Sequence, residues 1–390
     1  MVLNIKNATI VLPDEVINNA SITIVDGKID KIDGCLDEGT VIDAKGAYLL
    51  PGMIDIHSDH IEQAIEPRPG SLMETEFAIS VQEKQLINSG ITTMYHSMSM
   101  WRPVISGLSR KTLREGELLE RVIKEIIAAV KAPRLIDHKL HIRFDITNIE
   151  ALDPLMGILK DGEISLLSFM DHTPGQGQYR DVEKARASIK AYNPHLSEEE
   201  TEKRFKERMN VDKVTNAKLT EIAEFAISKG ISIASHDDDS VEKVDFVKNE
   251  LKATISEFPV ELEVARYATK AGMATLGGAA NVLMGKSHSG NLSAIEGVLD
   301  NCISMLCSDY YPPAMLKAVF KLHRDFNLPL HQCVKLVSSA PAKAVGIDGE
   351  VGSIEVGKKA DLIMVDASCK YTNITNVITN GKIASTLNYS

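Results

Sequence analysis

The chain has 390 residues, enough for two or three ordinary domains or for one α/β barrel with a small satellite domain. Hydrophobic residues make up 44% of it and charged residues 25%, close to the globular average, so a disordered chain, a fibre and a collagen are excluded. Five scattered cysteines without a CxxC pair argue for reduced thiols in a cytoplasm, and against a disulfide framework or a cysteine-rich zinc site.

The charge balance bears on the partners of the protein. Lysine and arginine number 43 against 54 acidic residues, which gives a net charge of −11. A surface this acidic is a poor partner for DNA or RNA, but it does not exclude an anionic small molecule, because bound metal ions and a few arginines reverse the local field. No run approaches 18 apolar residues, and the N-terminal segment is interrupted by Asn and Lys, so neither a membrane span nor a signal peptide is expected.

Both ends of the chain predict short strands. Residues 1–50 contain β-branched runs separated by Asp-Gly and Lys-Gly turns, and residues 346–390 show the same pattern. We therefore expect one small β domain built from residues 1–50 and 346–390. Residues 51–345 would form a separate domain.

The middle of the chain alternates apolar runs with helical stretches, which is typical of βα units and predicts an α/β fold. Apolar residues at i, i+3 and i+4 predict helices over 115–131 and 216–229, and residues 181–213 form a charged helical insertion. Seven runs are expected to be strands: MIDIHSD (53–59), ITTMYHS (91–97), LHIRFDI (140–146), ISLLSFMDHT (164–173), ISIASHDDDS (231–240), MATLGGA (273–279) and ISMLCSDYYP (303–312).

A side chain of a metal-ligating type stands at the end of one predicted strand after another. In a (β/α)8 barrel the active site lies at the carboxyl ends of the strands, so these residues would converge. His57 and Asp59 are two positions apart and so point to the same face of a strand, where both can reach one ion. Two exposed polar residues at a strand end are the plainer alternative, which the preceding Pro-Gly and the apolar MIDI run disfavour.

Further candidate ligands follow later strands. His172 and His236 each end an apolar run, and neutral imidazole is the commonest side-chain metal ligand. Asp309 follows a very apolar run and is either a strand cap or, as we favour, a carboxylate at the barrel mouth that would hold a metal and accept a proton from metal-bound water. Asp145 is either one half of an ion pair with Arg143 or a carboxylate that bridges two metals, and the sequence leaves the two readings open.

Two segments are suited to binding anions. Arg68 lies between two prolines in a rigid turn just after the first metal motif. The Gly/Ser loop over 285–291 offers hydrogen-bond donors from His288, Ser289 and Asn291. Neither segment matches the GxxxxGK[ST] pattern, so a P-loop nucleotide enzyme is excluded.

The sequence resembles the amidohydrolase superfamily, through LLPGMIDIH near one end and VGSIEVGKKADLIMVD near the other. Five further motifs in order resemble the PhnM-type enzymes of phosphonate breakdown more closely. They are PGMIDIHSDHIEQAIEPRPG, FMDHTPGQGQY, SHDDDS, NVLMGKSHSGN and LCSDYYPPAML. The chain departs from that pattern at Ser58 and His60, at Asp145 where Glu is expected, and in lacking a lysine after the fourth strand.

The resemblance implies a TIM-like barrel with a small β domain, and a hydrolase acting on α-D-ribose 1-methylphosphonate 5-triphosphate; the cysteine pattern places it in the cytoplasm. Pyrophosphate would be released, and the 5-phosphate would remain for the carbon–phosphorus lyase pathway, with whose other enzymes this one would associate. Asp309 would be the catalytic base, and Arg68, His288, Ser289 and Asn291 would bind the substrate. One or two divalent ions (Zn, Mn, Fe or Co) would be held by His57, Asp59, Asp145, His172, His236 and Asp309.

Two other functions stay open at this stage. The same metal chemistry serves hydrolysis of a C–N bond, as in a deaminase, a cyclic amidase or a deacetylase. A non-catalytic scaffold on the same fold is disfavoured because every strand-end ligand type is present. The number and identity of the ions, the loop that meets each end of the substrate and the alkyl group of the phosphonate are also open, and a homodimer is expected only as the commonest assembly.

Overall fold

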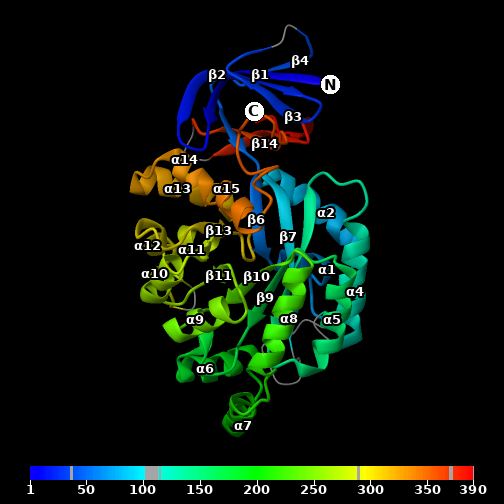
Figure 1. The fold of residues 1–390 in the computed structure, drawn as a ribbon, viewed down its shortest axis with the longest axis vertical. Coiled ribbons are helices and arrows are strands. Elements are labelled where there is room, and N and C mark those ends of the chain that lie inside the picture. The colour runs from blue at the N-terminus through cyan, green and yellow to red at the C-terminus, as the bar shows by residue number, and fades with distance from the viewer. Residues whose placement is uncertain (36–37, 102–112, 114–115, 288–289, 369–371, 390) are drawn as a thin grey trace.

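The computed structural model describes the whole chain except residues 36–37, 102–112, 114–115, 288–289, 369–371 and 390. It contains two eight-stranded sheets, one built from both ends of the chain and one from its middle (Figure 1). None of the helices described is both long and apolar enough to cross a membrane.

The terminal sheet confirms that strands from the two ends combine. β5 pairs antiparallel with β14 in a register that sets Pro51 opposite Leu362, which joins the N-terminal and C-terminal strands. The strand order is β16-β15-β14-β5-β1-β2-β3, with β4 beside β1. The domain boundaries expected after residues 50 and 345 stay predictions. The strands are β1 (Val2–Val11), β2 (Val16–Val25), β3 (Lys28–Ile32), β4 (Thr40–Asp43), β5 (Tyr48–Pro51), β14 (Leu362–Asp366), β15 (Asn373–Thr379) and β16 (Lys382–Thr386).

The middle sheet is parallel, and its strands lie in chain order from β6 to β13. A parallel bridge between Ser58 and Asp309 brings the last strand beside the first, so the sheet curls into the expected barrel. Strands such as β6 and β7 are buried at every residue because helices cover the outer face and side chains fill the interior. The strands are β6 (Met53–Ser58), β7 (Ile91–Met100), β8 (Asp137–Asp145), β9 (Leu166–Met170), β10 (Ser232–His236), β11 (Ile255–Glu257), β12 (Ala274–Gly278) and β13 (Met305–Cys307).

Seven of these strands correspond to the predicted runs, and β11 was not predicted. It has three residues, too few to show an alternating pattern, and a polar pair, Ser256 and Glu257, makes up most of it. Its place is fixed by parallel pairing with β10 on one side and β12 on the other.

The predicted helices are present as α4 and α8, and the insertion forms α6 and α7. Ser197 and Glu200 make a capping box at the start of α7, which gives this charged helix a defined end. The helices are α1 (His60–Ile65), α2 (Thr75–Asn88), α4 (Gly116–Ala129), α5 (Leu152–Asp161), α6 (Val182–Tyr192), α7 (Glu198–Met209), α8 (Asn216–Ser228), α9 (Val241–Asn249), α10 (Leu262–Lys270), α11 (Ala279–Met284), α12 (Ala294–Leu299), α13 (Ala314–Phe326), α14 (Leu330–Lys335) and α15 (Ser339–Ala344).

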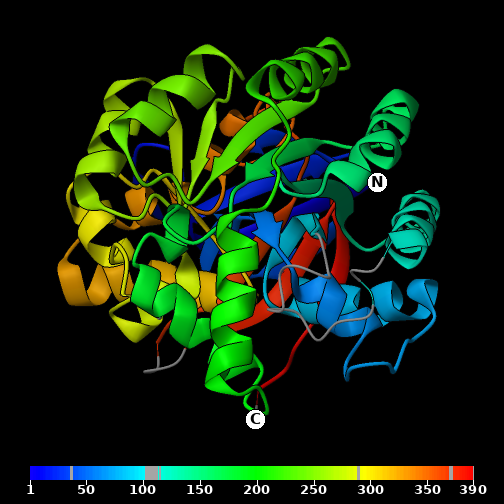
Figure 2. The same ribbon diagram turned by 90° about the horizontal axis from the view of Figure 1, so that it is seen from below.

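The two ends of the barrel are covered differently. The terminal sheet lies at the end where β6 begins, directly after β5. The α6–α7 insertion follows the carboxyl end of β9 and lies at the far end of the molecule, as Figures 1 and 2 show. The carboxyl ends of the barrel strands therefore open toward the insertion, away from the terminal sheet.

Candidate metal centre and active site

The first and last barrel strands meet at the site through their backbones. The Asp309 amide donates to the His57 carbonyl at 3.0 Å, and the Asp59 amide donates to the Asp309 carbonyl at 2.8 Å. Asp309 follows β13 with φ of 62°, and Asp237 follows β10 with φ of 53°, so both lie in the left-handed region that aspartate tolerates better than most residues. These turns end the strands at the residues that carry the site.

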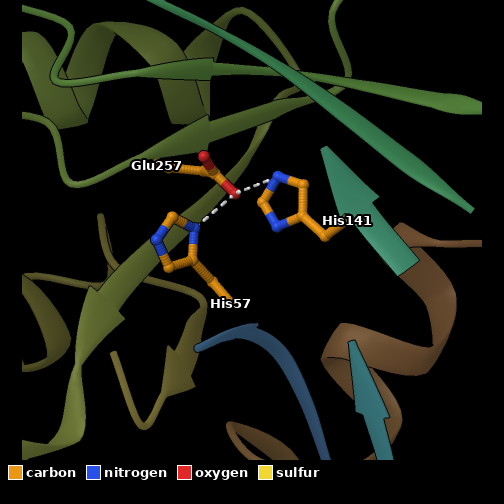
Figure 3. A group of neighbouring side chains, drawn as sticks. All are labelled: His57, His141 and Glu257. Atoms are coloured by element: carbon orange, nitrogen blue, oxygen red, sulfur yellow. Dashed lines mark hydrogen bonds and ion pairs between the residues drawn. The ribbon is translucent and has the colours of Figure 1, made fainter. Parts of the chain in front are cut away.

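A buried carboxylate joins three histidines in the barrel interior. Glu257 Oε1 lies 2.9 Å from Nδ1 of His57 and 3.7 Å from Nε2 of His141 (Figure 3). Its other oxygen, Oε2, lies 3.2 Å from Nδ1 of His236 and accepts a hydrogen bond from Ser168 at 2.8 Å. Burial by itself would raise the pKa of Glu257, but the nearby His141 ring and the hydrogen bonds from His236 and Ser168 outweigh burial and lower that pKa.

The hydrogen bonds to Glu257 assign the histidine tautomers. Burial, aided by the positive charge of Arg143, holds the pKa of His57 and of His236 well below the ordinary value, so both rings are neutral. A neutral ring that donates Nδ1–H to Glu257 carries its lone pair on Nε2. Nε2 of His57 is buried and has no hydrogen-bond partner among the described residues, as an atom suited to ligating a cation would be.

Strand β8 supplies three inward side chains at alternate positions, each aimed at a different part of the site. His141 accepts or donates through both ring nitrogens, to Ser97 at 3.0 Å and to Ser168. Arg143 donates from Nη2 to Nε2 of His236 at 3.1 Å, and Asp145 Oδ2 lies 3.2 Å from Nδ1 of His172.

A second cluster lies beside the first. Nε2 of His172 and Nε2 of His236 lie 3.8 Å and 3.6 Å from Oδ2 of Asp237, an oxygen with no hydrogen-bond partner in the described chain. Nδ1 of His172 is occupied by its contact with Asp145, which leaves Nε2 as the ring atom nearest Asp237. His172, His236 and Asp237 thus offer three potential ligand atoms within reach of one another, and imidazole with carboxylate suits Zn, Mn, Fe or Co.

The buried carboxylates point to the same conclusion. Burial raises the pKa of Asp55 to about 6, of Asp237 to about 6 and of Asp309 to about 7. The negative charge of Asp59 adds to the effect on Asp309. Several ionised carboxylates buried together are costly unless they take up protons or a cation neutralises them, so the residues present fit a divalent ion.

A cavity of about 300 Å³ opens over these residues. Asp59, His172, His236 and Asp309 line it together with Asp237 and Arg143, while Trp101 stacks on His172 with ring centroids 4.6 Å apart. Polar neutral side chains and apolar side chains make up the rest of the lining; the polar ones are Tyr179, Asn281, Ser287, Asn291 and Tyr310.

The sequence profile of the amidohydrolase family matches residues 48–387. The chain belongs to the amidohydrolase family. Along 97% of its length, it is 31% identical to the alpha-D-ribose 1-methylphosphonate 5-triphosphate diphosphatase of Escherichia coli (strain K12), of which it covers 99%.

Solved structures show the same amidohydrolase fold. The N-acetylglucosamine-6-phosphate deacetylase of Pasteurella multocida superimposes with a TM-score of 0.66 at 12% identity, over 98% of this chain and 99% of that one. The dihydropyrimidinase of Brevibacillus agri NCHU1002 gives a TM-score of 0.67 at 15% identity, over 98% and 95%. At these identities the likeness shows the shared fold alone.

The amidohydrolase site gathers most of the residues expected from the sequence. His57, Asp59, Asp145, His172, His236 and Asp309 all lie at one end of the barrel interior or in the cavity lining. Their roles as ligands, and that of Asp309 as base, stay predictions. For Asp145, the geometry favours neither the ion pair with Arg143 nor the carboxylate that bridges two metals. This carboxylate contacts His172 and accepts hydrogen bonds from the amide and hydroxyl of Thr147 at 2.9 and 2.6 Å.

The predicted anion-binding residues are placed less uniformly. Asn291 lines the cavity, whereas Arg68 is exposed on its turn, bridged to Ser71, and is outside the described lining. His288 and Ser289 fall outside the described residues. Substrate binding by all four stays a prediction.

Several residues at the centre of the site were not among the site residues predicted from the sequence. Glu257 lies on the strand that was too short to predict, and Asp237 was noted only as one of three consecutive aspartates. His141 and Arg143 had a usable signal, since the run His-x-Arg-x-Asp alternates in phase with the inward face of β8.

Proposed function

We propose that this amidohydrolase is a metal-dependent phosphoanhydride hydrolase acting on α-D-ribose 1-methylphosphonate 5-triphosphate in phosphonate breakdown. The single observation that carries the proposal is the similarity to the Escherichia coli diphosphatase along nearly the whole length of both chains. A cavity that joins ligand-type histidines and carboxylates to an arginine supports it, because a polyphosphate substrate needs positive charge at the reacting phosphorus.

In the proposed reaction, water adds to phosphorus and the anhydride bond between the first and second phosphates of the triphosphate breaks. Pyrophosphate leaves, and the ribose 5-phosphate remains. The proton lost by water passes to a carboxylate, for which Asp309 is suited because burial and Asp59 raise its pKa to about 7, near the working pH.

The residues proposed to hold one or two divalent ions are His57, Asp59, His172, His236 and Asp309. Such an ion would activate water and polarise the phosphoryl oxygens when bound. Asp237 presents a buried oxygen without a hydrogen-bond partner among the described residues to His172 and His236, and it joins this set. Asp145 and Glu257 orient His172 and His57 by accepting their Nδ1–H groups, so that each ring presents Nε2.

The remaining parts of the proposal concern the setting. Asn291 and Ser287, which line the cavity, are proposed to bind the anionic ends of the substrate. Arg68, His288 and Ser289 are proposed to do so as well, from the two anion-binding segments of the sequence. A cytoplasmic location, a homodimer and association with other enzymes of phosphonate breakdown are proposed with it. The described cysteines Cys35, Cys302, Cys307 and Cys333 are free, in keeping with a reducing compartment.

The test is a product assay. Protein loaded with Mn²⁺ or Zn²⁺ is incubated with the ribose triphosphate, and phosphorus NMR follows pyrophosphate and the 5-phosphate. We expect the two products in equal amounts, with no activity after chelation of the metal. Release of ammonia or a carboxylate from a dihydropyrimidine or an N-acetyl sugar, with no pyrophosphate from the triphosphate, would overturn the proposal in favour of C–N hydrolysis.

A further inference from the structure

The cavity contains a buried arginine to which neither the sequence reading nor the comparisons give a function in the site. Arg143 lies two residues before the end of β8, and only 7% of its surface is exposed. Of the described residues that line the cavity, it alone carries a permanent positive charge. Its Nε is buried and has no hydrogen-bond partner in the described structure.

Other nearby cations are committed elsewhere. Lys243 donates to the carbonyls of His236 and Asp237 at 2.8 and 3.0 Å and so fixes the turn after β10. Arg208, on α7, donates to the His172 carbonyl at 2.7 Å and lies over the Tyr179 ring. Arg180 pairs with Glu261.

Arg143 is balanced by the same groups that would take a cation. Its Nη2 uses the lone pair on Nε2 of His236, and its charge lowers the pKa of Asp237 and of Asp309 against the stronger effect of burial. A divalent ion bound by these side chains would take both the lone pair and the carboxylate charge away from the guanidinium. A buried guanidinium without a counter-charge is costly, so the loaded site calls for an anion at that point.

We propose that Arg143 binds the phosphoryl or phosphonyl group of the substrate in a bidentate manner, with Nε and one Nη each donating to one of its oxygens. The planar fork of arginine matches the spacing of such oxygens, and charge-assisted hydrogen bonds in a buried site are strong. This inference rests on the proposed function for the class of anion, and it makes Arg143 a determinant of specificity for phosphorus oxyanions.

The experiment measures binding rather than turnover. Methylphosphonate and inorganic phosphate are titrated calorimetrically into Mn²⁺-loaded protein, with acetate as the comparison anion, and metal content is measured for every variant. We expect Arg143→Gln to weaken binding of both phosphorus anions at least tenfold with metal content unchanged, and Arg143→Lys to weaken it less. Arg180→Gln, which makes the same change in net charge outside the cavity lining, should leave binding as it is.

Two outcomes of the binding measurements would overturn the inference. One is the same phosphate affinity in Arg143→Gln and in the unmodified protein. The other is loss of bound metal in Arg143→Gln, which would make Arg143 a residue that positions His236. A crystal structure of the unmodified, Mn²⁺-loaded protein with methylphosphonate gives a check that needs no variant. Arg143 should contact the phosphonate oxygens. An Arg143 side chain that still contacts His236 instead would contradict the inference. If phosphate binding depends on Arg143 but the protein releases no pyrophosphate from the triphosphate, the proposed function is wrong and this inference still holds.

Discussion

Glu257 lies 2.9 Å from Nδ1 of His57, although the two residues are 200 positions apart in the chain. The carboxylate is fully buried and holds His57 and His236 at once, one on each oxygen. A carboxylate in this position fixes the ring orientation and tautomer of a ligating histidine and makes its other nitrogen a better donor to a metal.

The first prediction concerns this carboxylate. Glu257→Gln keeps the size of the side chain but removes the charge that orders two histidines, so metal affinity should fall by about 10- to 100-fold. Competition against a fluorescent chelator measures it. Glu163→Gln, at the half-exposed pair with Lys131, is the matched control and should leave the affinity unchanged. Equal affinities in the two variants would contradict the assigned role of Glu257.

Asp309→Asn tests the proposed base. The variant keeps a ligand oxygen but cannot take a proton, so kcat should fall on the order of 10²- to 10⁴-fold when metal content is matched. Turnover is measured by pyrophosphate release at saturating metal. Asp348→Asn, on an exposed stretch, serves as control. Full activity in Asp309→Asn would remove the residue from proton transfer.

Metal binding should depend on pH in a defined direction. Burial first, and then Asp59, raises the pKa of Asp309 to about 7, and burial raises that of Asp237 to about 6. Both carboxylates must lose a proton before they hold a cation, so affinity should rise as the pH goes from 5 to 8, with protons released on binding. An indicator dye in weak buffer measures the release near pH 6.5. The number of protons released should be smaller in Asp309→Asn. An equal release in the variant and the unmodified protein would contradict the prediction.

The predicted anion contacts are tested by comparing two positions. Asn291→Ala and Arg68→Ala should each raise KM for the triphosphate while leaving bound metal unchanged, because each removes a donor to phosphate oxygens. Steady-state kinetics and metal analysis give both quantities. Arg68 is exposed and Asn291 lines the cavity, so an unchanged KM for Arg68→Ala alone would restrict substrate binding to the cavity.

Asp361 gives a prediction about stability, at the join between the two sheets. Burial raises its pKa to about 6 from 3.8, although it accepts the Asn380 amide at 2.7 Å. Between pH 4 and 6 the folded state therefore binds more protons than the unfolded state, and stability falls as pH rises through this window. The difference corresponds to about 3 kcal/mol at most.

Asp361→Asn should remove this loss, because the amide oxygen still accepts from Asn380 and no charge is buried. The variant should be more stable than the unmodified protein at pH 7 and similar to it at pH 4. Urea unfolding at both pH values measures the difference, with Asp348→Asn as control. A variant less stable at pH 7 would show that the charged carboxylate is compensated in the fold.

The sequence predicted the ligand types at the strand ends because of a simple geometric rule. Parallel strands in a barrel all end at the same face, so His57, His172, His236 and Asp309 had to converge if each followed a strand. That inference needed only apolar runs and the polar residue after each. It failed for Glu257 because a strand of three residues carries no periodicity, and its position comes entirely from pairing with its neighbours.

By itself the amino-acid order determined the barrel, the sheet drawn from both termini and the residues that reach the carboxyl face. Only the tertiary structure decided which partners those residues meet: that His57 and His236 share Glu257, that Asp145 turns toward His172, and that Arg143 faces the cavity while Arg68 does not. The physical reason is that local patterns fix the face of a strand on which a side chain lies, whereas hydrogen-bond partners depend on the register and curvature of strands far apart in the chain.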